Sequence, residues 1–245
     1  MISFVIPAHD EHRLIVRTLD AIHAAARPPG EPYEVLVVDD RSSDDTARLA
    51  AERGARVLRV EYGHIAAARN HGAAAASGDW LVFVDADTLV DAAVVKAAGA
   101  ALSLGAVGGG AIAQFDGRVP IWAMAIGWVW GRAQRSLRLA NGCFLFCSRE
   151  AFDAAGGFDE GLYAMEDLAL SRALRRRGPF VILRHSVVTS GRNLRTGSFR
   201  DALAMLWGFV RHGPGLFRNR AALQYWYGGR RDDPRDGLPL LRIER

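Results

Sequence analysis

The stretch LVFVDADTLV, residues 81–90, sets two carboxylates directly behind a short apolar run. Apolar runs of this length, rich in β-branched and aromatic residues and bounded by polar ones, predict buried strands. Asp85 and Asp87 would therefore stand at the end of a strand in the core of the fold. Two carboxylates in that position could hold a metal ion, or one of them could act as a nucleophile.

The segments before this stretch alternate between strand-like and helix-like patterns. We expect strands at 2–8, 33–40, 55–60 and 79–87, and helices at 14–23, 42–54 and 65–77. This rhythm predicts an α/β fold with a doubly wound, mainly parallel sheet. Ligands of such sheets bind beyond the C-terminal ends of the strands.

Acidic side chains follow three of the four expected strands. They are Asp10 and Glu11 after the first strand, Asp39 and Asp40 after the second, and Asp85 and Asp87 after the fourth. A parallel sheet would bring these ends to one edge, where the carboxylates would repel one another. We therefore expect a divalent cation and cationic side chains among them.

The pattern changes after residue 91. We expect a helix to residue 104, a glycine-rich strand at 106–115, a tryptophan-rich segment at 121–140, a strand at 142–148 and a helix at 166–178. No linker rich in Pro, Gly or Ser divides the chain, so we expect one domain with a C-terminal extension.

The composition is that of a globular protein with an uneven charge. Half of the 245 residues are apolar, which allows a substantial core. Residues 1–169 carry 15 basic and 22 acidic side chains, a net charge of −7, whereas residues 170–245 carry 16 and 5, a net charge of +11. A basic segment of this kind can meet phosphates, anionic lipid or nucleic acid, or can simply be solvated.

The chain is expected in the cytoplasm. Charged residues from Asp10 onward interrupt the first apolar run, so we expect no signal peptide. The uncharged runs at 97–115 and 119–131 are interrupted by glycine or too short, so neither is expected to span a bilayer. On one strand, the spacing of Cys143 and Cys147 would place both on the same face as buried free thiols.

Two enzyme chemistries fit the carboxylates at 85 and 87. In a phosphohydrolase of the haloacid-dehalogenase type, the motif D-x-D-x-T lies near the first strand, and a lysine well downstream balances the aspartyl-phosphate. Here 84 residues precede Asp85, and no lysine follows Lys96. The alternative, a clamp for a metal-bound nucleotide, is therefore favoured.

Four motifs, in order along the chain, support the nucleotide clamp. They are VIPAHDE at 5–11, VVDDRSSDDT at 37–46, AARNHGAAAASGDWLVFVDADT at 67–88 and AFDAAGGFDEGLYAMEDLALSRALRRRG at 151–178. With these motifs in register, the chain resembles a family 2 glycosyltransferase of the GT-A fold over about residues 2–178.

The resemblance implies a Rossmann-like GT-A domain at 1–190, with a nucleotide-binding half at about 1–90 and an acceptor half at about 91–190. A basic, aromatic-rich helical extension would follow at 191–245. The implied reaction transfers a single sugar, with inversion, from a nucleotide-diphosphate sugar to an acceptor hydroxyl, assisted by Mg²⁺ or Mn²⁺. The family's habits favour a UDP-sugar, with a GDP-sugar as the alternative.

The resemblance also assigns the donor site. The nucleotide pocket would be lined by Pro7, Ala8, Glu11, Asp39, Arg69, Asp85 and Arg192. The metal would be held by Asp87 and Asp85, and His185, after the last core strand, would complete its shell. Arg192 ends the segment TSGR, which would form a flexible lid that closes over the diphosphate.

The catalytic residues would come from the fourth motif. Asp167 would be the general base on the acceptor hydroxyl, with Glu166 positioning it. Structural alternatives remain for these and other residues: acids at the start of a helix are favoured by its dipole, Asp39 could cap a helix, and Arg69 could form a structural ion pair. His185 could be a surface or core histidine.

The chain departs from the family pattern in several places. Arg41 stands where glycine is usual, and the Q-x-x-R-W signature of processive synthases is absent, so we do not expect a polymerising enzyme. A nucleotidyltransferase is a second candidate, although IPAHDEHR lacks the glycine-rich loop typical of that group. A non-catalytic nucleotide-sugar-binding protein is a third, and the intact acidic residues argue against it.

The acceptor and partners are left open. Residues 121–130 contain Trp122, Trp128 and Trp130, which could be helical core, an apolar or lipid-linked acceptor site, or a membrane-facing wedge. The extension mixes arginine with aromatic residues, which could serve peripheral attachment to the inner face of the membrane, homodimer or core packing, or polyanion binding. Nucleic acid is not among the expected partners.

Overall fold

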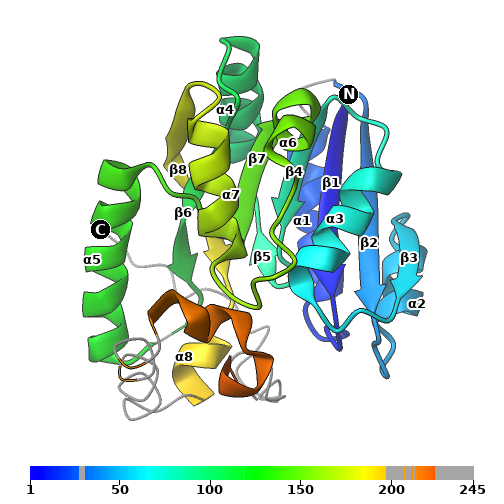
Figure 1. Ribbon diagram of the computed structural model, residues 1–245. Helices are drawn as coiled ribbons and strands as arrows, with labels where there is room; N and C mark the ends of the chain where they lie inside the picture. The colour runs from blue at the N-terminus through cyan, green and yellow to red at the C-terminus, as the bar shows by residue number, and fades with distance from the viewer. Residues whose placement is uncertain (28–30, 118, 197–206, 208–210, 212, 224–245) are drawn as a thin grey trace.

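The computed structural model describes residues 1–27, 31–117, 119–196, 207, 211 and 213–223. Figure 1 shows a central sheet with helices on both sides of it. The expected α/β architecture is therefore confirmed.

The N-terminal half alternates strand and helix as the sequence predicts. Its elements are β1 (Ile2–Ala8), α1 (Ile15–Ala26), β2 (Tyr33–Asp40), α2 (Thr46–Glu52), β3 (Arg56–Val60), α3 (Ile65–Ala75) and β4 (Trp80–Val84). β1 pairs in parallel with β2 and β4, and β2 pairs in parallel with β3. The C-terminal ends of these strands therefore meet at one edge of the sheet.

The C-terminal half has a mixed sheet. Its elements are β5 (Thr88–Leu89), α4 (Ala92–Ser103), β6 (Gly108–Phe115), α5 (Ile121–Leu137), β7 (Phe144–Ser148), α6 (Arg149–Ala155), α7 (Glu166–Arg175), β8 (Phe180–Thr189), α8 (Arg192–Thr196), and the 3₁₀ turns η1 (Gly213–Arg218) and η2 (Arg220–Leu223). β7 runs antiparallel to β4 and β6, β6 runs parallel to β8, and β5 runs antiparallel to β8. The sheet is therefore purely parallel only in its first four strands.

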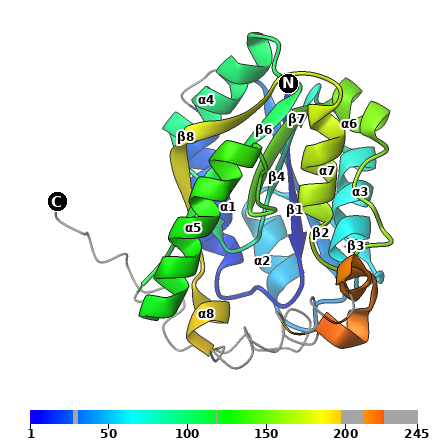
Figure 2. The ribbon, with the colours of Figure 1, turned by 60° about the vertical axis from the view of Figure 1, so that its left-hand side comes forward.

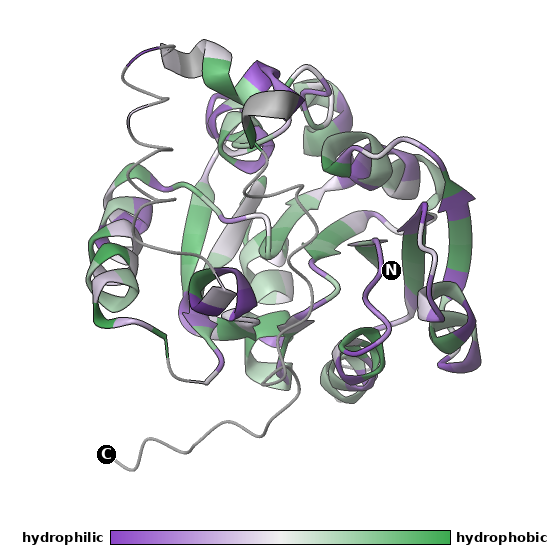
Figure 3. Cartoon of the chain, turned by 90° about the horizontal axis from the view of Figure 1, so that it is seen from below, coloured by the Kyte–Doolittle hydropathy of each residue, from purple (hydrophilic) through white to green (hydrophobic). Residues whose placement is uncertain are grey.

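The described strands form one sheet in the order β3-β2-β1-β4-β7-β6-β8-β5. Two hydrophobic clusters cover its faces, because side chains alternate along each strand. Along β1, Phe4 joins the cluster under α1 and α4, whereas Val5 joins the cluster under α3, α6 and α7. Figure 3, seen from below, shows hydrophobic strands between the flanking helices.

Gly72 explains how closely α3 approaches the sheet. A Cβ at this position would lie 2.4 Å from Cγ1 of Val5 and 2.9 Å from Cγ2 of Val38, both closer than real contacts allow. Only glycine fits here, so α3 can lie directly on β1 and β2. Arg69, one turn earlier on α3, is thereby brought to the ends of the strands.

The cysteines lie on different faces of the sheet. Both are buried free thiols, as expected. Cys147 belongs to the cluster under α3, whereas Cys143 belongs to the opposite one. The expected shared face is wrong, because β7 begins at Phe144 and Cys143 lies before the alternating part of the strand.

The C-terminal extension is described only in part. α8, η1 and η2 agree with its predicted helical character, and the remainder of 191–245 lies outside the described residues. The backbone N–H of Tyr163 donates to the carbonyl of Phe217 at 2.8 Å, so η1 is attached to the loop that leads into α7. Among the described helices, none has the length and hydropathy needed to cross a membrane.

Candidate active site

The candidate site lies where β1, β2 and β4 end, beside the first turn of α7. In the view of Figure 1, α8 lies below α7. Pro7 and Ala8 end β1, and the loop behind them is fixed by the motif after β2. The N–H of Asp10 donates to Oγ of Ser42 at 2.9 Å, and the N–H of Glu11 donates to Oγ1 of Thr46 at 2.7 Å. The first two motifs therefore build one continuous wall of the site.

Asp39 and Asp40, at the end of β2, have different roles. Asp40 accepts from the N–H groups of Gly63 and His64 at 2.8 and 2.9 Å, so it holds the loop before α3. Asp39 is buried, and its Oδ1 accepts no hydrogen bond within the described residues. A buried acceptor without a donor carries a desolvation cost, which a ligand N–H would remove.

Arg69 is the most deeply buried charge of the site, with only 1% of its side chain exposed. Its Nη1 donates to Oε1 of Glu166 at 2.6 Å, and its Nη2 donates to Oδ1 of Asp85 at 2.7 Å. Burial alone would lower the pKa of Arg69, but Asp85, Glu166 and Asp167 outweigh it and raise that pKa. The arginine therefore stays charged and joins β4 to α7.

Glu166 and Asp167 are adjacent in the sequence but differ in access. Glu166 is buried against Arg69, whereas Asp167 is half-buried and accepts from the N–H of Gly142 at 2.6 Å. Burial, with Glu166 beside it, raises the pKa of Asp167, although Arg69 and the N–H groups of Leu168 and Gly142 oppose the shift. Asp167 is therefore the member of the pair that combines access with proton affinity.

Asp87 and Glu11 share one cation, Arg192. The guanidinium forms two hydrogen bonds with the Glu11 carboxylate, one of them from Nη1 to Oε2 at 2.8 Å, and Nη2 lies 3.4 Å from Oδ2 of Asp87. Burial raises the pKa of Asp87 to about 7, with Arg192 opposing the shift and Glu11 and Asp85 adding to it. Ionisation of Asp87 beside Glu11 is therefore unfavourable, even with Arg192 close to both carboxylates.

The predicted lid is anchored in this structure. The N–H of Gly191 donates to Oδ1 of Asp116 at 2.8 Å, and Nη1 of Arg195 donates to the same oxygen at 2.8 Å. Arg192 opens α8 with its side chain buried. The segment at 189–192 thus delivers Arg192 to the strand ends, and its closing motion stays a prediction.

The carboxylates at 85 and 87 suit a hard divalent cation. Magnesium and manganese take oxygen ligands, and in nucleotide sites one or two protein carboxylates suffice because phosphates and water complete the shell. A bound cation would favour the ionised form of Asp87, whose pKa is raised by burial. Within the described part of the chain, no group of three or more His, Cys, Asp or Glu side chains forms a closed metal cage.

His185 does not join these carboxylates. The sequence placed it after the last core strand, but it is an exposed residue within β8, which continues to Thr189. β5 pairs with β8 at Val188 and Thr189, whereas His185 lies three residues before Val188, where the pairing of β8 with β6 is irregular. No described contact links His185 to Asp85 or Asp87, and its role as a metal ligand stays a prediction.

Two residues of the site were not foreseen from the sequence. Gly142 supplies the backbone N–H that holds Asp167, and Thr189 donates from Oγ1 to Oδ1 of Asp87 at 3.2 Å. The glycine acts through its backbone N–H, and a sequence motif does not reveal the role of a backbone group. Thr189 reaches the site because β8 pairs with the two-residue β5, and that pairing is invisible in the sequence.

Comparison with known proteins defines the class. The sequence matches the family described as "Glycosyl transferase family 2" over residues 3–152, more than half of the chain. The chain therefore belongs to glycosyl transferase family 2, as its motifs indicated.

Individual relatives are similar over shorter stretches. An undecaprenyl-phosphate 4-deoxy-4-formamido-L-arabinose transferase from Klebsiella pneumoniae is 34% identical over 97 residues, which cover 35% of this chain and 28% of that protein. A validoxylamine A glucosyltransferase from Streptomyces hygroscopicus is 36% identical over 96 residues, which cover 36% of this chain and 21% of that protein. The match thus spans less than a third of these relatives.

Solved structures confirm the fold. A mannosyltransferase from Pyrobaculum calidifontis, in complex with GDP-Man and Mn²⁺, superposes with a TM-score of 0.64 at 20% identity, over 94% of this chain and 70% of that one. S. aureus TarS 1-349, in complex with UDP-GlcNAc, superposes with a TM-score of 0.61 at 18% identity, over 94% and 72%. At these identities the likeness establishes the GT-A fold.

Proposed function

We propose that this protein is an inverting glycosyltransferase that moves one sugar from a nucleotide-diphosphate sugar to an acceptor hydroxyl. The observation that carries the proposal is the arrangement around Arg69, which holds Asp85 on one side and Glu166 on the other. The D-x-D end of β4 and the first turn of α7 are thereby fixed together. A donor diphosphate at the first and a base at the second would lie on opposite sides of a transferring sugar.

The donor would be held by the strand ends. The unsatisfied Oδ1 of Asp39 is suited to accept an N–H of the nucleotide base, beside the wall formed by Pro7, Ala8 and Glu11. Arg192 would present its guanidinium to the diphosphate. Asp87 and Asp85 would hold Mg²⁺ or Mn²⁺, which would supply charge neutralisation for the leaving diphosphate.

The acceptor would be activated by Asp167. This carboxylate would take the proton of the acceptor hydroxyl while the oxygen bonds to the anomeric carbon and the bond from that carbon to the β-phosphate oxygen breaks. The elevated pKa of Asp167 suits proton uptake near neutral pH, and such base catalysis contributes about 10²- to 10⁴-fold. Attack opposite the leaving group inverts the anomeric configuration.

The similar proteins support a nucleotide-sugar donor without deciding its base. One neighbour was solved with GDP-Man and Mn²⁺, and another with UDP-GlcNAc. Both UDP- and GDP-sugars are therefore candidates here, and the UDP-sugar stays the first choice of the sequence analysis.

Donor hydrolysis tests the proposal without knowledge of the acceptor, because water can replace the hydroxyl. Wild-type protein should slowly hydrolyse one of the UDP- or GDP-sugars in the presence of Mn²⁺, and proton NMR should detect the inverted anomer first. Release of the sugar with retained configuration would contradict inversion. Release of pyrophosphate from nucleoside triphosphates would instead support a nucleotidyltransferase.

A further inference from the structure

The helix α5 buries small or polar residues and exposes large apolar ones, which is the reverse of the usual arrangement. Its buried residues are small or polar, namely Ala123, Gly131 and Gln134, and neither core cluster includes a residue of α5. Its large apolar residues instead point outward, and each exposes more than half of its surface: Ile121, Met124, Ile126, Trp128, Val129 and Leu137. Soluble proteins rarely expose so many large apolar side chains on one helix without a partner.

The helix α5 lies on the outside of the part of the molecule that the structure describes. Figures 1 and 2 both place the helix on the outside of the molecule, at the opposite end from β3. Trp122 and Trp130 are the exceptions among its large apolar residues, because both are only partly exposed, and Nε1 of Trp130 donates to Oδ1 of Asn141 at 2.9 Å. Asn141 precedes Gly142, which holds Asp167, so the inner side of α5 adjoins the acceptor side of the proposed site.

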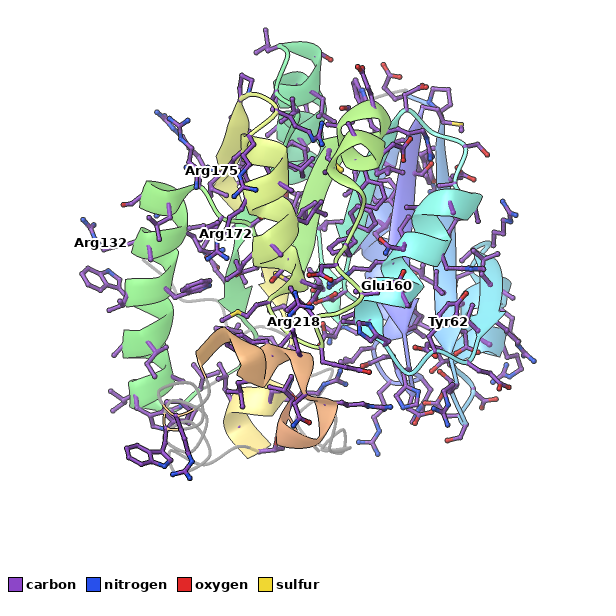
Figure 4. The ribbon with its side chains drawn as sticks, in the orientation of Figure 1. Tyr62, Arg132, Glu160, Arg172, Arg175 and Arg218 are labelled. Carbon is purple, nitrogen blue, oxygen red and sulfur yellow. The ribbon has the colours of Figure 1, made fainter. Side chains whose placement is uncertain are left out.

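The charged side chains of α5, and the described side chains that α7 extends toward it, are arginines. The helix contains no acidic residue, and Arg132 lies over the Trp128 ring, with Cζ 5.4 Å from the ring centroid. Arg172, Arg175 and Arg176 line an open cavity of about 270 Å³ on the neighbouring α7. Arg172 and Arg175 extend from α7 on the side of α5 (Figure 4), and Arg175 donates to the carbonyl of Leu137 at the end of α5.

These arginines have no acidic counterpart nearby. None of Arg132, Arg172, Arg175 and Arg176 forms an ion pair with a carboxylate of the described residues. A second copy of the same surface would bring like charges together and leave them unneutralised. A partner with an apolar interior and an anionic surface, such as a lipid bilayer, would suit both the apolar side chains of α5 and the neighbouring arginines.

We propose that α5 and the arginines of α7 form a docking surface for an anionic lipid bilayer, which we call the α5 surface. The apolar side chains would enter the boundary between headgroups and acyl chains, where tryptophan is favoured. The arginines would contact the lipid phosphates. The sequence analysis considered membrane contact both for residues 121–130 and for the C-terminal extension, and this assignment selects the first, which lies on α5. It does not depend on the proposed transferase reaction.

Vesicle co-sedimentation of the full chain tests the proposal without donor or metal. Wild-type protein should sediment with phosphatidylcholine vesicles that contain phosphatidylglycerol, less with pure phosphatidylcholine, and less as salt is raised. The double variant Met124→Ser/Trp128→Ser should lower the bound fraction by about tenfold. Arg172→Gln/Arg176→Gln should remove most of the preference for the anionic vesicles.

Matched controls lie elsewhere on the surface. Leu104→Ser removes an exposed apolar side chain at the end of α4, and Arg59→Gln removes an exposed arginine on β3, so neither should change sedimentation. Circular dichroism would verify that every variant is folded. Unchanged sedimentation of the Met124→Ser/Trp128→Ser variant would overturn the proposal. So would a dimer in light scattering that this variant abolishes, because a second copy would then occupy the α5 surface.

Discussion

Arg69 and Asp85 form an ion pair in which Nη2 of the buried arginine lies 2.7 Å from Oδ1 of the half-buried aspartate. The same guanidinium donates to Glu166, 97 residues away in the sequence. One side chain on α3 therefore connects the end of β4, where the donor would bind, with the first turn of α7, where the base would act.

Loss of the Arg69 guanidinium should destabilise the fold. In Arg69→Met, Glu166 would remain buried without its cation, so the free energy of unfolding should fall by about 3–5 kcal/mol. Urea denaturation measures the change. The control is Arg48→Met, which breaks an exposed ion pair on α2 and should leave the midpoint nearly unchanged. Equal midpoints for the Arg69 variant and wild type would contradict the structural role of the pair.

Substitutions of Asp167 and Glu166 should have different effects on activity and stability. Asp167→Asn keeps the shape of the side chain but removes proton uptake, so transfer or donor hydrolysis should fall by about 10²- to 10⁴-fold while donor affinity persists. Glu166→Gln should lower stability as well as activity, because it weakens the buried contact with Arg69. Steady-state kinetics together with donor binding distinguishes them, and full turnover by Asp167→Asn would remove it as the base.

The metal-free protein should lose stability as pH rises. The folded pKa of Asp87 is raised from 3.8 to about 7, so between these values the folded state binds more protons than the unfolded state. Stability from this group is fully present below pH 3.8 and declines through that window. Melting temperatures in EDTA should therefore fall more between pH 5 and pH 7 in wild type than in Asp87→Asn. Parallel curves for the two proteins would argue against a buried, neutral Asp87.

Replacement of Gly72 by alanine should destabilise the fold, whereas the same replacement at Gly127, another helical glycine, should not. A methyl group in Gly72→Ala would collide with Val5 and Val38, which should cost about 1–3 kcal/mol and displace Arg69. Gly127→Ala, on α5, meets only Phe115 at 3.9 Å and should be neutral or stabilising by up to about 1 kcal/mol. Chemical denaturation compares the two, and similar stabilities would disprove the close packing of α3.

The N-terminal half could be predicted in detail because local signals and topology agree there. Apolar runs, helix caps and turn residues alternate, and a parallel sheet leaves one edge for the acidic residues that follow its strands. From the sequence we could predict that cations must lie among the carboxylates, but not that Arg69 pairs with both Asp85 and Glu166. No local pattern connects residues that are 97 positions apart.

The C-terminal half was harder to predict because its strands pair across long separations. β5 has two residues and exists through its ladder with β8, so neither the end of β8 nor the place of His185 could be deduced. The sequence of α5 shows a helical period, but it does not show which side of the helix faces the core. An apolar helix is ordinarily expected to face the core, and here the small residues are inside.

Donor binding is the most direct test of the central claim. Thermal-shift assays should compare UDP, GDP and their common sugar conjugates, with and without Mn²⁺, on wild type, Asp87→Ala and the control Asp79→Ala. Asp79 is an exposed aspartate that directly precedes β4, at the opposite end of this strand from Asp85 and Asp87. We predict that one nucleotide series stabilises wild type and Asp79→Ala only with Mn²⁺, and does not stabilise Asp87→Ala. Stabilisation of none of the proteins, or of Asp87→Ala equally, would contradict the nucleotide clamp at the end of β4.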